Sequence, residues 1–271
     1  MVYRTADPFV AADINPFTNA PYDDSWIIFS LTDTNEYQMM NGGVNAPVYT
    51  LKVSKQYAQW RMSVFDFLQY QQTNNKNVIL SISDTDYADA QKHYGNHSYN
   101  DRFLRDYEPD VLVHSTTREC WEQIKKDNCL KSWNILKREN PHWETAPIGK
   151  VLSDPPDFSD YIMFSTGGIS GEIVVSSKQR GKITMDPNIS YQTGARLYFD
   201  LKKIAEDGLL VRDGCHLKVK DKLELEPYLL WVGEWTTIGL DTDISTPKEF
   251  TELSNSTFNR IFGKSIEPSC P

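Results

Sequence analysis

DVLVHSTTRECWEQIKKDNCL, residues 110–130, is the stretch that decides the fold we expect for the second half of the chain. Its apolar run at residues 111–113 predicts a buried strand, and Cys120, Trp121 and Ile124 then recur at helical spacing. The sequence therefore predicts a strand that passes directly into a helix.

Four polar residues lie at this junction: His114, Ser115, Thr116 and Thr117. Their hydroxyl groups can cap the exposed amides of the helix, and Glu119 lies in its first turn. Free N–H groups and the helix dipole can also hold a polar or anionic ligand. The alternative is that His114 is a hydrogen-bonded core residue and the hydroxyls are only caps.

The composition is that of a folded globular protein. The chain has 271 residues, 39% hydrophobic content and seven Trp, so we expect one main domain with a substantial extension. The four cysteines form no C-x-x-C pair and indicate free thiols of a reducing compartment, although a Cys120–Cys129 bond stays open. There is no long apolar run and no secretory signal pattern. We therefore expect a cytoplasmic protein without a membrane partner.

The net charge of −9 works against sequence-independent attraction to nucleic acid. A nucleic-acid partner would need a local basic patch, unless these charges are only solvated faces. The two candidate patches are Lys125, Lys126, Lys131, Lys137 and Arg138, and separately Lys178, Arg180 and Lys182. No metal site is expected, since Gly95-Asn96 separates His93 from His97 and no carboxylate completes a zinc pattern.

The first 105 residues are expected to form a mostly helical extension of unknown role. Residues 1–24 show no periodicity and predict an extended arm. Apolar residues recur at helical spacing over residues 50–73, and shorter helices are expected at 84–94 and 100–107. The strands expected in this region are residues 25–31 and 78–83.

Short strands dominate the pattern of the second half. A strand at residues 161–165 ends in a Gly-rich turn that lacks the lysine of a P-loop. Asp213-Gly214 between two apolar runs predicts a hairpin. The other expected elements are a strand or helix at 172–177, strands at 182–185, 195–200 and 223–235, and helices at 131–140, 201–207 and 254–262.

Three stretches resemble the ADP-ribosyltransferase-like superfamily, and within it the RNA 2′-phosphotransferases most of all. They are VLVHSTTRECWEQIKKDNCL, DYIMFS, and TGARLYFDLKKIAEDGLLVRDGCHLKVKDKLELEPYL. The resemblance implies an α+β fold of split antiparallel β-sheets with short flanking helices. We expect an NAD-binding domain at residues 106–245, followed by a C-terminal tail at 246–271.

The same resemblance implies that NAD is the cofactor and assigns residues to it. His114 would bind the nicotinamide ribose, with Ser115 and Thr116 beside it. Aromatic packing on the nicotinamide would come from Tyr161 or Phe164. Ser165, near a ribose, and Arg196 complete the candidate cofactor contacts.

The chain departs from the family pattern at several positions. Tyr161 and Met163 replace the histidines of the second motif, and Gln192-Thr193 replaces an Arg-His pair. Recognition of a 2′-phosphate needs strong donors, for which Arg180 or Arg196 could substitute.

Transfer of ADP-ribose uses a carboxylate near the reacting sugar, because a negative charge stabilises the oxocarbenium-like centre that develops there. The candidates are Glu172, Glu224 and Glu226, with His114, Glu172 and Glu226 ranked as the catalytic residues. Glu172 follows the Gly-rich turn, and Glu226 is expected in a late strand.

The sequence thus predicts an NAD-dependent transferase that moves ADP-ribose to a macromolecular acceptor, either protein or nucleic acid, with water also possible. The alternatives are an RNA 2′-phosphotransferase that uses NAD, and a non-catalytic module that binds NAD or ADP-ribose. The sequence leaves the oligomeric state open.

Overall fold

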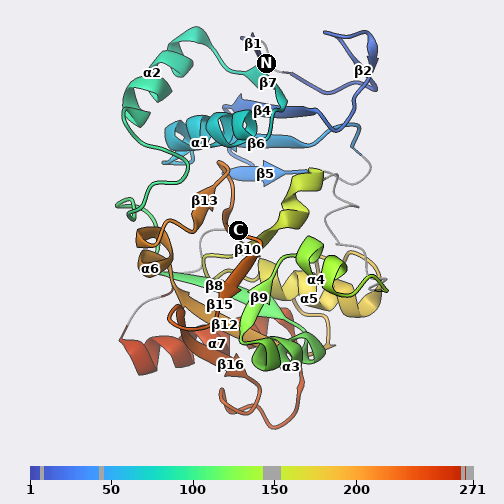
Figure 1. The fold of residues 1–271 in the computed structure, drawn as a ribbon, viewed down its shortest axis with the longest axis vertical. Coiled ribbons are helices and arrows are strands. Elements are labelled where there is room, and N and C mark those ends of the chain that lie inside the picture. Colours follow the sequence, from blue (N-terminus) through green and yellow to red (C-terminus); the bar gives the residue numbers. More distant parts are fainter. Residues whose placement is uncertain (7–8, 43–45, 143–153, 264–265, 267–271) are drawn as a thin grey trace. The chain divides into compact units, whose positions relative to one another are not determined.

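The computed structural model describes residues 1–6, 9–42, 46–142, 154–263 and 266, and it divides the chain into two compact units (Figure 1). The first unit comprises Met1–Asp101, Glu144–Asp160 and Val211–Leu217. The second unit comprises Arg102–Trp143, Tyr161–Leu210 and Lys218–Pro271. Each unit is built from segments that are distant in the sequence.

A five-stranded, mostly parallel sheet forms the centre of the first unit, with the order β1-β7-β4-β6-β5. Its parallel strands are β1 (Val2–Thr5), β7 (Asn77–Ser81), β4 (Trp26–Thr32) and β6 (Thr50–Ser54). Strand β5 (Met39–Asn41) pairs antiparallel with β6 at one edge. The interior strand β4 is buried over residues 26–30, as expected for a strand covered on both faces.

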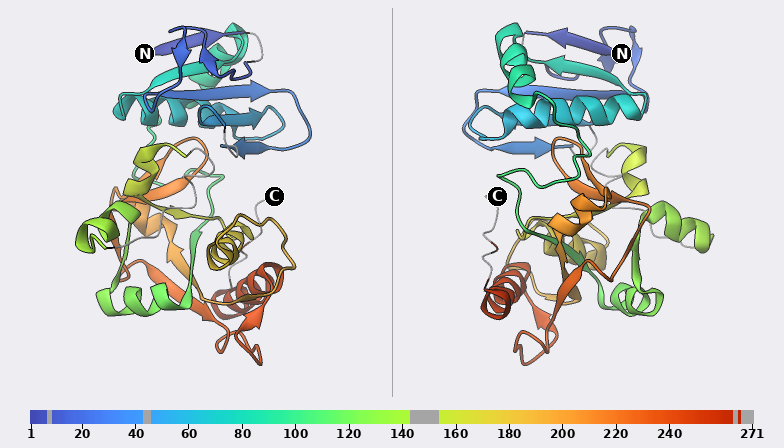
Figure 2. Two further views of the ribbon diagram at one scale, coloured as in Figure 1. Left: turned by 90° about the vertical axis from the view of Figure 1, so that its right-hand side faces the viewer. Right: turned by 60° about the vertical axis from the view of Figure 1, so that its left-hand side comes forward.

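Both faces of this sheet are covered. Helix α1 (Trp60–Thr73) runs along one face, where Phe67 lies 5.3 Å from Phe29 between ring centroids (Figure 2). On the opposite face Tyr3 and Phe17 pack around Trp26. Because side chains of a strand alternate between faces, Trp26 and Phe29 contribute to two different cores.

The expected helical extension at the N-terminus is wrong. Residues 1–24 contribute the sheet strand β1 and the hairpin of β2 (Ile14–Asn15) and β3 (Ala20–Pro21). Residues 50–54 form strand β6, so the expected helix at 50–73 begins only at Trp60. Residues 100–107 form no helix. Helix α2 (Asp84–Tyr94) does form, although its N-cap is Ser83 and not Asp84.

The second unit holds several small antiparallel sheets. The longest has the order β16-β12-β8, formed by β16 (Leu229–Glu234), β12 (Ala195–Asp200) and β8 (Val111–Thr116). Two short pairs are β9 (Cys129–Lys131) with β15 (Lys222–Glu224), and β11 (Tyr191–Gln192) with β17 (Ile244–Ser245). A second three-stranded sheet has the order β10-β14-β13, formed by β10 (Tyr161–Phe164), β14 (Leu217–Lys220) and β13 (Leu210–Arg212), although residues 211–217 belong to the first unit. The β13–β14 hairpin confirms the Asp-Gly turn.

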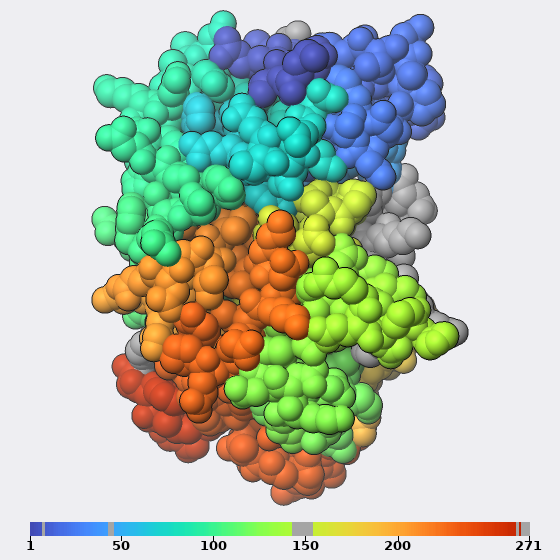
Figure 3. Space-filling model, viewed as in Figure 1, coloured from blue at the N-terminus to red at the C-terminus, as the bar shows by residue number. Residues whose placement is uncertain are grey.

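The predicted passage from a strand into a helix is confirmed. Strand β8 leads into α3 (Arg118–Asp127), and Thr117 caps the helix by accepting a hydrogen bond from the Cys120 amide at 3.3 Å. Helix α3 ends at Asn128, which adopts a left-handed conformation. Helices α3 and α4 (Trp133–Glu139) lie at the surface of the second unit (Figure 3).

Three further helices complete the second unit: α5 (Ser170–Arg180), α6 (Leu201–Glu206) and α7 (Pro247–Phe262). Helices α5 and α7 lie side by side (Figure 2). Residues 172–177 are therefore helical, residues 182–185 form no strand, and the last helix begins earlier than expected. The 3-10 helix η2 (Pro156–Asp160) belongs to the first unit.

The expected α+β fold of split antiparallel sheets with a helical extension is thus wrong for this chain. The structure is α/β, with a mixed, mostly parallel sheet near the N-terminus and small antiparallel sheets after it. The physical reason is that β1 and β6 are short, and residues 50–54 merge in the sequence with an apolar pattern that continues into α1.

Cys120, Cys129 and Cys215 are free thiols, and Cys270 lies outside the described residues. Across the described part of the chain, no helix has the length and apolar character needed to cross a membrane.

Candidate functional site

Strand β8 carries the candidate residues on two opposite faces. In its antiparallel pairing with β12, His114 lies opposite Leu197 and Ser115 lies opposite Arg196. Because neighbouring side chains of a strand point to opposite faces, the His114 side and the Ser115 side of this sheet are separate environments. The predicted cofactor contacts therefore divide into two groups.

On the first face, the His114 ring is fixed by two neighbours from β10. Its Nδ1 lies 3.1 Å from the main-chain oxygen of Met163, and the ring meets Phe164 edge to face with 5.9 Å between centroids. Phe164 in turn packs against Phe199, with 5.6 Å between centroids. Since a carbonyl oxygen only accepts, Nδ1 must carry the proton and donate it.

Burial lowers the pKa of His114 from its usual 6.5 to about 4, opposed by the hydrogen bond to Met163 and helped by the positive charge of Lys178. The imidazole is therefore neutral near pH 7, and its Nε2 holds a lone pair. Among the described residues, Nε2 has no hydrogen-bond partner. His114 is only half-buried, so this acceptor is reachable by a ligand hydroxyl.

Ser165 and Thr116 lie close to His114 in the backbone. Ser165 and Val113 exchange two backbone hydrogen bonds of 2.8 Å, which joins the end of β10 to β8. Thr116 is the last residue of β8, is buried, and pairs with Ala195. Ser165 thus pairs with the middle of β8, on the face opposite His114, whereas Thr116 lies at the end of the strand.

The two aromatic candidates on β10 have different surroundings. Phe164 contacts His114, whereas the ring of Tyr161 lies 4.5 Å from Lys218 Nζ, measured to the ring centroid. Lys218 is fully buried. Of the two, Phe164 is the aromatic residue beside His114.

On the second face, Arg196 is fully buried and its guanidinium is held internally. It donates to the main-chain oxygens of Gly167 at 2.6 Å and Gly168 at 3.1 Å. Further bonds reach Ser115 Oγ at 3.3 Å and Asn255 Oδ1 at 3.4 Å. Arg196 therefore fixes the Gly-rich turn instead of facing a ligand.

Glu172 belongs to this same buried network. It is 1% exposed, accepts a 2.7 Å hydrogen bond from the Tyr191 hydroxyl, and lies 3.5 Å from the Arg196 guanidinium. Burial, followed by the nearby Glu172 charge, raises the pKa of Tyr191, so this hydroxyl remains a donor. Glu172 is thus placed as a partner of Arg196, on the face of β8 opposite His114.

Glycine makes the close packing on this second face possible. A side chain at Gly171, in the first turn of α5, would approach Ser115 Oγ to 2.6 Å. The Ser115 side chain therefore packs between α5 and Arg196, on the face of the sheet opposite the His114 side chain.

Glu226 and Glu224 are exposed carboxylates. Glu224 is the last residue of β15, and Glu226 lies in the connection between β15 and β16, before Pro227. The expectation that Glu226 sits in a strand is therefore wrong.

Sequence reasoning missed Asn255 and Tyr191 as partners of the buried network. Asn255 lies in α7, a segment expected to be a tail, and its Oδ1 accepts a 2.9 Å hydrogen bond from Tyr198. Neither residue stands in a recognisable motif, and both reach the network through long-range packing. The helical spacing of the apolar residues Phe250, Leu253 and Phe258 was the available signal that α7 covers a core.

Two residues of the first basic patch are paired with carboxylates. Lys131 contacts Asp127 at 2.6 Å and Glu139 at 2.7 Å, and Lys125 contacts Glu122 at 2.6 Å. These ion pairs reduce the positive charge that the patch offers to a phosphate backbone.

A comparison of the chain with known protein families, curated proteins and solved structures finds no match.

Proposed function

We propose that the chain binds NAD at His114 and transfers ADP-ribose from it to a macromolecular acceptor, protein or nucleic acid. The observation that carries this proposal is the state of His114: a neutral imidazole with Nδ1 held by Met163 and Nε2 open to a hydroxyl donor. NAD offers ribose hydroxyls as donors and a nicotinamide ring for aromatic contact.

The neighbours of His114 fix its orientation. Phe164 is buried against the imidazole and holds the ring in place, whereas Ser165 pairs with Val113 and therefore faces the opposite side of the sheet. NAD supplies an N-glycosidic bond whose cleavage releases nicotinamide and leaves the sugar carbon for an acceptor nucleophile, which loses a proton. The protein contributes mainly positioning in such a transfer.

The position of Glu172 favours a second candidate function, a module that binds NAD or ADP-ribose without catalysis. Glu172 is enclosed with Arg196 on the other face of β8, so as placed it does not serve a sugar held at His114. The transferase proposal then needs another carboxylate, and Glu226 and Glu224 are the exposed candidates to test.

The 2′-phosphotransferase alternative has less support. Arg196, one of its two candidate phosphate donors, directs its guanidinium to Gly167, Gly168 and other internal partners. Arg180 is exposed and donates to the main-chain oxygen of Ser190 at 3.1 Å.

The test is a titration of the purified full chain with NAD that follows both binding and nicotinamide release. His114→Ala removes the acceptor, and His93→Ala, which alters an exposed histidine of helix α2 in the first unit, is the matched control. We expect binding and release to be lost in His114→Ala and kept in His93→Ala.

Glu226→Gln and Glu224→Gln separate the two candidate functions. Loss of release with unchanged binding in either variant supports the transferase. Binding without any release by the wild-type chain, in the presence of protein and nucleic-acid acceptors, supports the binding module. A folded wild-type chain that binds no NAD would overturn both.

A further inference from the structure

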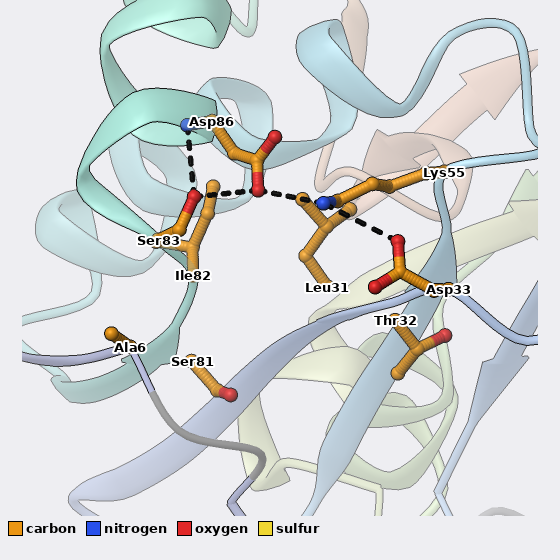
Figure 4. Close-up of a pocket in the computed structure, with 9 residues that line it drawn as sticks. All are labelled: Ala6, Leu31, Thr32, Asp33, Lys55, Ser81, Ile82, Ser83 and Asp86. Atoms are coloured by element: carbon orange, nitrogen blue, oxygen red, sulfur yellow. Dashed lines mark hydrogen bonds and ion pairs between the residues drawn. The ribbon is translucent and has the colours of Figure 1, made fainter.

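The carboxyl ends of the parallel strands in the first unit surround a pocket of about 450 Å³ (Figure 4). Ala6 follows β1, Leu31 and Thr32 end β4, and Ile82 follows β7. The remaining lining residues come from the same edge of the sheet: Asp33, Lys55, Ser81, Ser83 and Asp86. Its volume is within the range of small-molecule sites.

The topology of the sheet supports a binding role for this edge. The chain leaves β4 toward β6 on one side, then returns through α1 to β7 on the other side of β4. The strand order therefore reverses at the β4/β7 pair. In open α/β sheets, ligands bind outside the carboxyl ends of the strands at such a reversal.

The polar groups of the pocket form one connected set. Lys55 Nζ lies 2.8 Å from Asp86 and 3.3 Å from Asp33 (Figure 4). Ser83 Oγ donates to the Asp86 carboxylate at 2.6 Å and accepts from its amide at 3.1 Å. The hydrogen bond that Lys55 donates to Asp86 raises the pKa of Lys55, so the lysine is charged at pH 7.

The charges select against an ionic ligand. Lys55 is matched by the two carboxylates of the pocket, Asp33 and Asp86, and Ser83 already caps helix α2, whose first residue, Asp84, is paired with Arg4. A phosphate would therefore meet net negative charge at this helix end. A cationic ligand would have to displace Lys55 from its two carboxylate partners.

Hydroxyl groups suit this set better, because they can donate to the carboxylates and accept from the lysine. Asp33 is 85% exposed at its side chain and Asp86 is 22% exposed, so both retain oxygen lone pairs toward the pocket. Leu31 and Ile82 add an apolar surface between these polar groups (Figure 4).

We infer that this pocket binds a neutral ligand in which a vicinal diol is joined to a flat heteroaromatic ring, the chemistry of a nucleoside. The carboxylates of Asp33 and Asp86 accept from the two hydroxyls, Lys55 donates to one of them, and the ring lies against Leu31 and Ile82. This site lies wholly within the first unit and is independent of the NAD proposal.

The test uses adenosine as the probe, with the full chain carrying His114→Ala so that the other unit does not contribute. We expect saturable binding, measured by calorimetry, and at least tenfold weaker binding of 2′,3′-dideoxyadenosine, which corresponds to about 1.4 kcal/mol or more. Asp86→Asn should weaken adenosine at least tenfold. Lys92→Met, an exposed lysine later in helix α2, should leave it unchanged.

Three results would overturn the inference: no adenosine binding, equal binding of the dideoxy analogue, or competition by inorganic phosphate at millimolar concentration. The comparison of adenosine with its dideoxy analogue needs no change at Asp86, so a folding defect in Asp86→Asn does not affect it. If the wild-type chain bound no NAD, the NAD proposal would fail, but the comparison of adenosine with its dideoxy analogue would still test this pocket.

Discussion

At the scale of single residues, His114 stands out because its chemistry is set by the backbone around it. The main-chain oxygen of Met163 accepts a hydrogen bond from Nδ1, and burial keeps the ring neutral, so Nε2 is an acceptor by necessity. The sequence predicted a strand that ends before His114, whereas His114 lies inside β8. The sequence did not indicate that Ser115 and Arg196 face away from His114.

The lowered pKa of His114 predicts a dependence of stability on pH. The unfolded chain takes up a proton near pH 6.5, whereas the folded chain does so only near pH 4. The unfolded state thus binds more protons between these values, and the free energy of unfolding decreases as the pH decreases through this window.

His114→Gln should remove this contribution. We expect the wild type to lose more free energy of unfolding than the variant between about pH 6.5 and about pH 4, measured by urea denaturation. His93→Gln, at an exposed position, should follow the wild type. Parallel pH curves for wild type and His114→Gln would contradict a buried neutral imidazole.

At the scale of elements, the close approach of β8 and β12 depends on glycine at position 194. A Cβ added to Gly194 would lie 1.8 Å from the main-chain oxygen of Thr116. Since the obstacle is backbone, no side-chain movement relieves it, and the end of the β8–β12 ladder must separate.

Gly194→Ala should therefore destabilise the chain by about 3 kcal/mol or more, at the upper end of the cost of overpacking. Gly181→Ala is the control, because Gly181 has open space around it and only a left-handed φ of +65°. That variant should cost about 1 kcal/mol. Urea denaturation of both measures the difference, and equal effects would contradict the tight junction.

Elements with a strong local signal were predictable, and short sheet strands were not. Thr117 indicates the start of α3, and Asp213-Gly214 indicates the hairpin, because each signal depends only on residues close by in the sequence. Strand β6 becomes a strand only because β4 and β5 pair with it. Its pairing partners are distant in sequence, so residues 50–54 carry too little local information.

At the scale of the whole molecule, each unit is completed by segments that are distant in the sequence. In the first unit, Asp157 accepts a 2.6 Å hydrogen bond from the Tyr70 hydroxyl, and Phe158 packs on Tyr49. Gly214 lies so close to α1 that an added Cβ would be 2.9 Å from Phe67 Cβ. These contacts could not be predicted from an N-terminal segment considered alone.

The fragment 1–101 should therefore fold less cooperatively than the same residues in the full chain. It lacks both the η2 segment and the tip of the β13–β14 hairpin, which belong to the first unit. We expect rapid amide hydrogen exchange in β4 and β7 of the fragment and protection in the full chain. Equal protection of these strands in both would contradict a composite unit.

The fold and the site differed in how far the sequence could predict them. The parallel sheet was not predicted because its paired strands are far apart in the sequence, as in the pairing of Val2 with Val78, and no local pattern links them. The His114 junction was accessible because strand, cap and helix follow one another without interruption. The surroundings of the candidate carboxylates could not be predicted, because the burial of Glu172 depends on its distant partners Arg196 and Tyr191.

The measurement that tests the central claim most directly is the ¹⁵N NMR spectrum of the histidine side chains during an NAD titration of the full chain. We predict that Nε2 of His114 shifts as it accepts a hydroxyl, that Nδ1 stays protonated, and that His93 stays unchanged. Saturable NAD binding with an unperturbed His114 signal would contradict the account and place the ligand elsewhere.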